Sequence, residues 1–279
     1  MAWVVLLTNA SYLPGVVILG YSLRKVPSRY PLIVAVTQSL GDSSVNVLRK
    51  LGYEVRTVEP LRPRMRVNLA AERFEDTWTK LVVFGFYEFK RIVLIDGDMT
   101  VVRNMDEIFN LDIPKDWVAA NHACVCNIDK ADWADPDWRI VHKPLKHPEA
   151  LAHPTLILPT SPRTHLLLNS GLVVLHPSKK LFEDMDFIAV FFCDHWLPIG
   201  YQYNAIKTAR YKHPEMWRDL EVKNVHYIVK KPSSVGRSIG ERDEVLHGWW
   251  WDEFANWEKD ADEDIEEEEE EKGFCGRRN

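Results

Sequence analysis

The chain of 279 residues has few cysteines and no long apolar run. Its four cysteines include no Cys-x-x-Cys pair, which argues against a disulfide-stabilised scaffold and fits a reducing compartment. Cys124 and Cys126 are separated by one residue and can together hold a metal, but we expect them to be free, partly buried thiols. No segment approaches the roughly 18 consecutive apolar residues of a membrane-spanning helix.

The first residues also lack the pattern of a secretory signal. No basic residue precedes the apolar run at 3–7, and that run stops at Thr8 and Asn9. We therefore expect a cytoplasmic protein with no membrane segment.

A net positive charge is missing as well. The formal net charge is −6, but residues 258–271 alone contain eleven acidic residues and one lysine. The remainder is close to neutral and has no general positive field that would recruit nucleic acid. We predict one domain over residues 1–257, followed by a disordered acidic tail over residues 258–279.

What the sequence does contain is a regular alternation of short apolar segments with segments of helical spacing. Strands are expected at 3–7, 32–36, 53–58, 91–95, 171–175 and 224–229, and helices at 14–25, 42–51 and 77–90. The β-α-β-α-β order of the first half predicts an α/β fold with a parallel sheet wrapped by helices. Residues from 122 to about 168 lose all periodicity, and we expect an irregular excursion there.

The most informative segment is RIVLIDGDMT at 91–100, where two aspartates follow a continuous apolar strand. The sequence holds five Asp-x-Asp pairs, and only Asp96 and Asp98 have this context. Two carboxylates at the end of a buried strand are costly unless a cation compensates them, and oxygen ligands favour Mg²⁺ or Mn²⁺. Gly97 leaves room for a ligand to approach the backbone.

The same segment also fits a different enzyme. Residues 92–100 match the hydrophobic-DxDxT pattern of haloacid-dehalogenase-like phosphatases, in which Asp96 would be the nucleophile and Asp98 the acid/base. That family usually carries the motif on its first strand and needs a later acidic pair. Here three other predicted strands precede it and no such pair is evident, so this is the less favoured alternative.

Several motifs in order resemble glycosyltransferase family 8, the family of glycogenin and galactinol synthase. They are LLTNASYLPGVVILGYSL at 6–23, RFEDTWTKL at 73–81, DGDMTVVRNMDEIF at 96–109, HACVCN at 122–127, LNSGLVVLHPS at 168–178 and NVHYIVKKP at 224–232. The resemblance implies a Rossmann-like nucleotide-diphospho-sugar transferase fold of the GT-A type, with a single domain and a mixed, mainly parallel sheet.

The resemblance also implies the residues of the site. Asp96, Asp98 and His226 would bind the metal, and Asp184 and Lys80 would act in catalysis. The UDP-sugar and its metal would together be held by Leu6, Thr8, Asn9, Tyr12, Arg73, Lys80, Asp96, Gly97, Asp98, Asn169, Ser170, His226 and Lys231.

The implied activity is a retaining transfer of galactose or glucose from a UDP-sugar to an acceptor hydroxyl, dependent on Mn²⁺, with Mg²⁺ as the alternative ion. The acceptor would be a small polyol or a glycan. This chain departs from the family in a shortened segment at 178–187, in Met185 and in Ser233. These departures affect the sugar and acceptor side, so a protein that binds UDP-sugar with impaired catalysis is the alternative.

Overall fold

The structure is a computed structural model that describes residues 1–61, 72–127, 136–138, 148–179, 182 and 195–275, with the side chains of 72–77 and 264–275 excepted. Contacts divide the chain into two compact units, Met1–Ile228 and Val229–Asn279. Each unit is described separately below.

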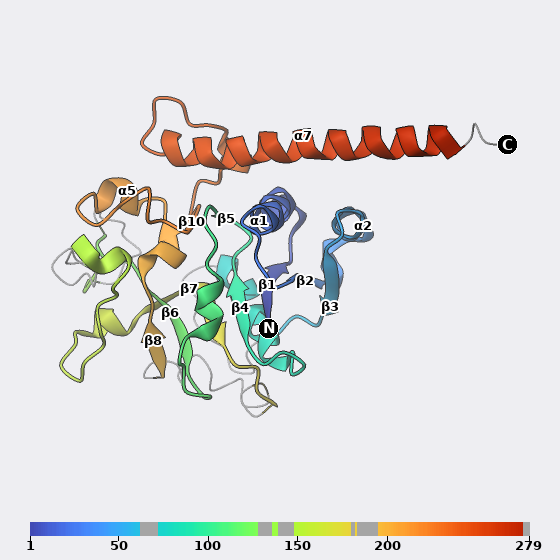
Figure 1. Ribbon diagram of the computed structural model, residues 1–279. Helices are drawn as coiled ribbons and strands as arrows, with labels where there is room; N and C mark the ends of the chain where they lie inside the picture. The colour runs from blue at the N-terminus through green and yellow to red at the C-terminus, as the bar shows by residue number, and fades with distance from the viewer. Residues whose placement is uncertain (62–71, 128–135, 139–147, 180–181, 183–194, 276–279) are drawn as a thin grey trace. The chain divides into compact units, whose positions relative to one another are not determined.

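The larger unit is built on a seven-stranded sheet with the order β3-β2-β1-β4-β7-β6-β8 (Figure 1). Its strands are β1 (Ala2–Leu7), β2 (Leu32–Thr37), β3 (Glu54–Val58), β4 (Ile92–Ile95), β6 (Val118–His122), β7 (Leu168–Leu175) and β8 (Trp196–Pro198). Strand β7 runs antiparallel to β4 and β6, and the other pairs are parallel. The predicted mixed, mainly parallel sheet is confirmed.

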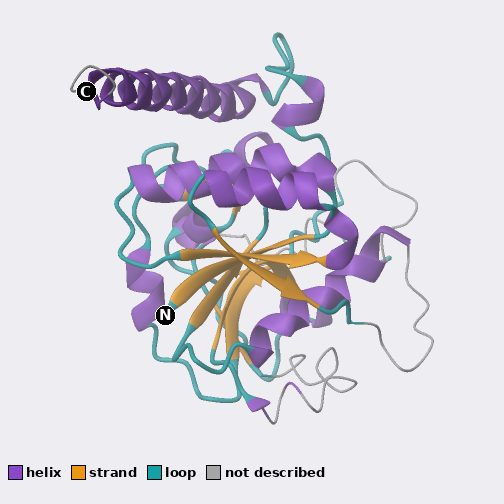
Figure 2. Ribbon diagram, turned by 90° about the vertical axis from the view of Figure 1, so that its right-hand side faces the viewer, coloured by secondary structure: helices purple, strands orange, loops and turns teal. Residues whose placement is uncertain are grey.

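Helical segments cover both faces of this sheet (Figure 2). They include α1 (Leu13–Lys25), α2 (Asp42–Lys50), α5 (Ala209–Lys212) and the 3-10 segments η3 (Glu72–Gly85), η4 (Asp106–Asn110), η6 (Pro148–Leu151), η7 (Arg163–Leu166) and η9 (Tyr201–Tyr203). Alternate residues of β1 enter two separate cores: Trp3 packs in the core that contains residues of α1, and Val4 in the core that contains residues of η3. All four residues of β4 are buried, as its continuous apolar sequence predicts.

A second, three-stranded sheet has the order β5-β10-β9, with β5 at Met99–Val101, β9 at Ala205–Ile206 and β10 at Asn224–His226. Strand β10 is antiparallel to β5, and His226 lies opposite Met99. The backbone N–H of Tyr227 donates to the carbonyl oxygen of Asp98 at 2.9 Å. This small sheet therefore brings a histidine from late in the chain to the turn that follows β4.

Helix α1 packs closely on that same turn. A Cβ added at Gly15 would clash with the carbonyl oxygen of Gly97, and one added at Gly97 would lie 2.7 Å from Cγ2 of Val16. The hydroxyl of Ser22 accepts a 3.0 Å bond from the backbone N–H of Val101. Helix α1 thus fills the space on the Cβ side of Gly97, and the approach of a ligand to this backbone stays a prediction.

Several predicted elements differ from the structure. The helix expected at 77–90 is the 3-10 segment Glu72–Gly85, which ends earlier, and the strand expected at 224–229 ends at His226. Val229 has a φ of 65°, in the left-handed region, so it cannot continue an extended strand. Strands β5, β6, β8 and β9 were not predicted, because each is short and takes its stability from its neighbours in a sheet.

The smaller unit contains α6 (Pro232–Val235) and the long helix α7 (Glu244–Cys275). The rings of Trp250 and Phe254, four residues apart on α7, are stacked with centroids 5.5 Å apart. Helix α7 extends into the acidic run that we expected to be disordered. The domain boundary at residue 257 stays a prediction. Among the described helices, none combines the length and apolar character needed to cross a membrane.

The contact between α1 and the turn predicts the effect of a small substitution. Gly15→Ala should lower the free energy of unfolding by about 1–3 kcal/mol, because the new methyl group meets backbone that cannot move without shifting α1. Urea denaturation followed by circular dichroism measures this. The matched control is Gly248→Ala on α7, where the nearest atom to the new Cβ is 4.0 Å away. Equal stability of the two variants would contradict the packing described.

Candidate functional site

Three side chains predicted as metal ligands lie together in the larger unit. One potential ligand atom from each of Asp96, Asp98 and His226 lies within 4.8 Å of the other two. Nε2 of His226 is 3.3 Å from Oδ1 of Asp98 and 3.9 Å from Oδ2 of Asp96. The carboxylates follow β4, and the pairing of β10 with β5 supplies the imidazole. The side chains of Asp96 and His226, 130 positions apart in the sequence, thus lie in one group.

The imidazole of His226 is oriented by a chain of two amide side chains. Oδ1 of Asn169 accepts from the backbone N–H of Gly171 at 2.9 Å and from Nδ2 of Asn204 at 3.0 Å. The carbonyl end of the Asn204 amide must therefore face His226, and Oδ1 of Asn204 lies 2.9 Å from its Nδ1. Only a protonated Nδ1 can donate there, so Nε2, which points toward the two carboxylates, is the ring nitrogen that a metal ion would use.

Gly171 provides the space that this imidazole occupies. A Cβ at this position would lie 2.5 Å from Cε1 and 2.8 Å from Nδ1 of His226. The carbonyl oxygen of Gly171 also accepts from the backbone N–H of Asp96 at 2.8 Å. One glycine therefore joins the strand end that carries the carboxylates to the histidine side chain.

The donor set fits a divalent cation of the Mn²⁺ or Mg²⁺ type. Two carboxylates and one imidazole match the ligand preferences of such ions, and an ordered second layer holds the imidazole. The exposed fraction of the side chain is 22% for Asp96, 13% for Asp98 and 6% for His226. The group is therefore only slightly accessible to solvent. An ion held there would still have coordination positions for oxygens of a ligand.

Lys80 also reaches this group. Its Nζ lies 2.5 Å from Oδ1 of Asp96, and both side chains are about one-fifth exposed. The predicted association of Lys80 with the phosphate end of the site is consistent with this position, because the ammonium group lies beside the carboxylates. Its catalytic role stays a prediction.

The nucleotide-binding residues predicted near the N-terminus lie at and beyond the carboxyl end of β1. Strand β1 is parallel to β4, with Val4 opposite Leu94, so both strands end at the same edge of the sheet. Oδ1 of Asn9 accepts from the backbone N–H of Ser11 at 2.9 Å and caps a short helical turn. Tyr12 is 42% exposed, which leaves ring surface available to a base. Leu6 and Thr8 are half-buried.

The remaining predicted residues fall into three groups. Asn169 and Ser170 lie on β7, next to the end of β4, and Oδ1 of Asn169 is engaged in the amide chain described above. The side chain of Arg73 and the whole of Asp184 lie outside the described residues. Lys231 belongs to the smaller unit, where its carbonyl oxygen accepts from the backbone N–H groups of Ser234 and Val235.

Two residues of this site are absent from those predicted from sequence. Gly171 lies inside the LNSG motif, so its position beside two predicted residues was an available signal. Asn204 lies between a tyrosine and an alanine in no recognisable motif, and its burial at 1% exposure with His226 becomes evident only in three dimensions.

The mixed sheet and its helices agree with the comparisons with known proteins. The family model described as Glycosyl transferase family 8 matches residues 3–152, more than half of the chain. The chain belongs to this family, and the prediction that it is a hexosyltransferase is confirmed. The match decides against the haloacid-dehalogenase-like phosphatase.

Among characterised relatives, the chain is similar to galactinol synthase 6 of Arabidopsis thaliana, with 27% identity over 89% of this chain and 78% of that protein. It is 29% identical to galactinol synthase 1 of Solanum lycopersicum, over 88% of this chain and 78% of the relative.

Solved structures agree on the fold. The galactosyltransferase LgtC, in complex with donor and acceptor sugar analogues, superposes with a TM-score of 0.56 at 14% identity, covering 89% of this chain and 95% of LgtC. The glycosyltransferase GlyE of Streptococcus pneumoniae gives a TM-score of 0.55 at 14% identity, over 91% of this chain and 60% of GlyE. The GT-A type of fold expected from sequence is confirmed.

The amide chain predicts that Asn204 controls metal affinity without touching the metal. Asn204→Leu removes the acceptor for Nδ1 of His226 at nearly constant volume and should weaken Mn²⁺ binding by about 10–100-fold. Isothermal titration calorimetry measures this. Asn204→Asp keeps the acceptor for Nδ1 but loses the donor to Asn169, so it should weaken Mn²⁺ binding less than Asn204→Leu does. If both variants bound Mn²⁺ as tightly as the parent protein, the imidazole would not depend on this contact.

Proposed function

We propose that this protein is a Mn²⁺-dependent retaining glycosyltransferase that moves galactose or glucose from a UDP-sugar to a hydroxyl of a small polyol. Mg²⁺ is the alternative ion, and a glycan the alternative acceptor. The observation that carries the proposal is the convergence of Asp96, Asp98 and His226, with the imidazole turned toward the carboxylates by Asn204. The similarity to galactinol synthases supports a galactosyl donor and a polyol acceptor.

The residues at the sheet edge account for the binding of a charged donor. Asp96, Asp98 and His226 would hold the ion, which when bound supplies positive charge to the pyrophosphate and makes UDP a better leaving group. Lys80, 2.5 Å from Asp96, adds a further positive charge at this place. The exposed ring of Tyr12 would stack on the uracil. Arg73 and Lys231 would contact the phosphates, as the family resemblance implies.

The sugar would lie toward β7. Asn169 and Ser170 follow the half-buried start of this strand and would face the donor sugar. Leu6, Thr8, Asn9 and Gly97 complete the proposed donor site. Asp184 would orient the sugar or stabilise the positive charge that develops on it, and the sequence leaves open whether a covalent intermediate forms.

Loss of either carboxylate should remove donor binding while the fold persists. Asp96→Asn or Asp98→Asn should weaken Mn²⁺-dependent UDP binding by more than about tenfold, since each removes a charged ligand. The side chains lie at a strand end rather than in a core, so the thermal unfolding temperature should change little. Titration of UDP in the presence of Mn²⁺ measures the first effect, and circular dichroism the second.

The matched control for these variants is Asp116→Asn, which changes the same chemical group at an exposed position between η4 and β6. Its UDP affinity should equal that of the parent protein. Normal Mn²⁺-dependent UDP binding by both Asp96→Asn and Asp98→Asn would contradict the assignment of these two residues as metal ligands.

Release of free UDP from UDP-galactose and UDP-glucose, with and without candidate polyols and glycans, separates an enzyme from a protein that only binds the donor. We expect acceptor-dependent release with one of the two donors. Asp184→Asn should then lower turnover strongly while barely changing donor affinity, because the charge it removes acts mainly in the transition state.

The opposite results are equally informative. Donor binding without release under any acceptor would favour the binding-only alternative. Turnover of Asp184→Asn within about a factor of two of the parent would remove Asp184 from catalysis.

A further inference from the structure

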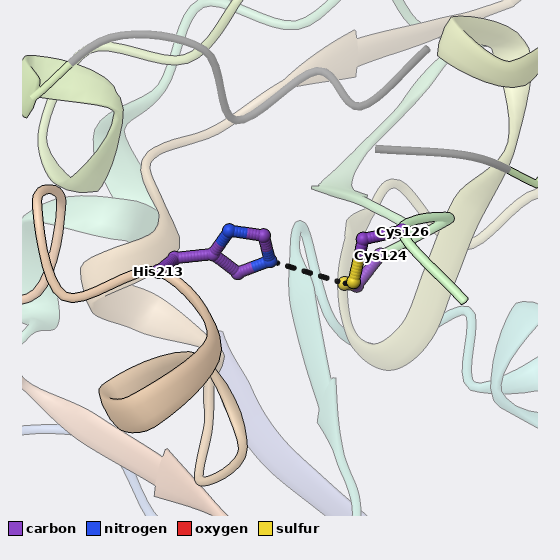
Figure 3. A group of neighbouring side chains, drawn as sticks. All are labelled: Cys124, Cys126 and His213. Carbon is purple, nitrogen blue, oxygen red and sulfur yellow. Dashed lines mark hydrogen bonds between the residues drawn. The ribbon is translucent and has the colours of Figure 1, made fainter. Parts of the chain in front are cut away.

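A second group of potential metal ligands lies beyond the end of β6. Cys124 and Cys126 follow that strand, and His213 follows α5; one ligand atom from each lies within 4.8 Å of the others. Figure 3 shows the imidazole of His213 pointing at the two sulfur atoms, which lie next to each other. Sγ of Cys124 is 3.5 Å from Nε2 of His213 and 3.1 Å from Sγ of Cys126.

These separations are close to those of ligands on one tetrahedral ion. With Zn–S near 2.3 Å and Zn–N near 2.0 Å, a sulfur and a nitrogen ligand lie about 3.6 Å apart, and two sulfur ligands about 3.8 Å. The distance of 3.5 Å between Cys124 and His213 matches the first value. The two sulfurs at 3.1 Å need only a small side-chain rotation to reach the second.

The surroundings of the Cys124 and Cys126 thiols disfavour their ionisation unless a cation lies beside them. The hydrogen bond with Cys126, followed by burial, raises the pKa of the Cys124 thiol well above its ordinary value. Burial, together with the two nearby sulfurs, raises the pKa of Tyr201 as well. Two adjacent thiolates are therefore unfavourable by themselves, whereas a divalent ion would neutralise both. Lys212 acts in the same direction by favouring the thiolate of Cys124.

The surroundings form a built site with one accessible side. His213 is 0% exposed and Cys126 is 4% exposed, while Cys124 is half-buried. The hydroxyl of Tyr201 donates to the carbonyl oxygen of His122 at 2.9 Å and ties the two contributing segments together. Solvent can reach the group at Cys124, where a fourth ligand would enter.

We propose that Cys124, Cys126 and His213 bind Zn²⁺ through three protein ligands, with a fourth position open to water or a small ligand. Sulfur ligands strongly favour Zn²⁺ over Mn²⁺, whereas carboxylate oxygens suit hard ions such as Mn²⁺ and Mg²⁺. The protein would thus hold two different ions in two chemically distinct sites. The free, partly buried thiols expected from sequence are the metal-free form of this second site.

The proposed ion would also join two segments that are distant in sequence. Strands β6 and β4 are both antiparallel to β7, so the residues after β6 leave the sheet at the same edge as Asp96. The segment from Tyr201 to His213 contributes Asn204 to the first site and His213 to the second. Binding of Zn²⁺ would therefore stabilise the segment that orients His226.

The test uses Co²⁺ and Zn²⁺ as probes on the reduced full-length chain that carries Asp96→Asn and Asp98→Asn, so that the carboxylate site is weakened. Addition of Co²⁺ without oxygen should produce thiolate-to-cobalt charge-transfer absorption that saturates at one equivalent and is abolished by Zn²⁺. Zn²⁺ should also raise the thermal unfolding temperature. These readouts do not depend on glycosyl transfer, so they hold whether or not the proposed function does.

Substitutions then assign the ligands. In the same background, Cys124→Ser should weaken Co²⁺ binding by more than about tenfold and remove the stabilisation by Zn²⁺, since one of two thiolates is lost. Cys124 is the accessible member of the group, so this variant should fold. The control Cys275→Ser changes a cysteine outside the group and should bind Co²⁺ normally.

The proposal would be overturned by no thiolate-to-cobalt absorption, by absorption unchanged in Cys124→Ser, or by a Cys124–Cys126 disulfide that forms on exposure to air in the presence of one equivalent of Zn²⁺. The last result would identify the pair as a redox couple. Loss of Co²⁺ binding in Cys275→Ser would point to a different set of thiols and would also contradict the assignment.

Discussion

The pairing of β10 with β5 is the interaction on which the candidate site depends. Its hydrogen bond from Tyr227 to the carbonyl oxygen of Asp98 fixes the register, and this register places His226 3.3 Å from that carboxylate. Asp96 and Asp98 alone would be two like charges at a strand end, partly removed from water. With the imidazole beside them they become a set of ligands that a divalent ion can satisfy.

The polar groups behind His226 form a chain in which each group hydrogen-bonds to the next. A backbone N–H and one side-chain amide converge on Asn169, and Asn204 in turn faces the imidazole. In a buried environment such bonds are strong, and an unpaired member is costly, so the chain holds one orientation of the ring. Gly171 completes it by leaving the ring its space. The orientation of the candidate ligand His226 is thus set by residues outside the group of candidate ligands.

The segment from Tyr201 to His213 connects this arrangement with the cysteine group. It lies between β8 and β10, contains the short elements η9, β9 and α5, and consists of buried and half-buried residues. Tyr201 contacts the end of β6, Asn204 contacts His226, and His213 contacts Cys124. Side chains from one short segment therefore contribute to both groups. Neither Asn204 nor His213 lies in a sequence motif of its own.

The sequence by itself determined the alternation of strands and helices in the first half and the buried strand before Asp96, because these follow from local periodicity. It also singled out Asp96, Asp98 and His226, through short motifs and the family resemblance, as the candidate ligands that the structure brings together. The tertiary structure decided what depends on distant pairing. Short strands such as β5 and β9, which pair with β10 on its two sides, were not predicted, because strands of three residues or fewer take their stability from their neighbours in the sheet. Asn204 and His213 acquire their roles only when folding brings them to His226 and Cys124, since contact between distant residues leaves no periodic signal in a single sequence.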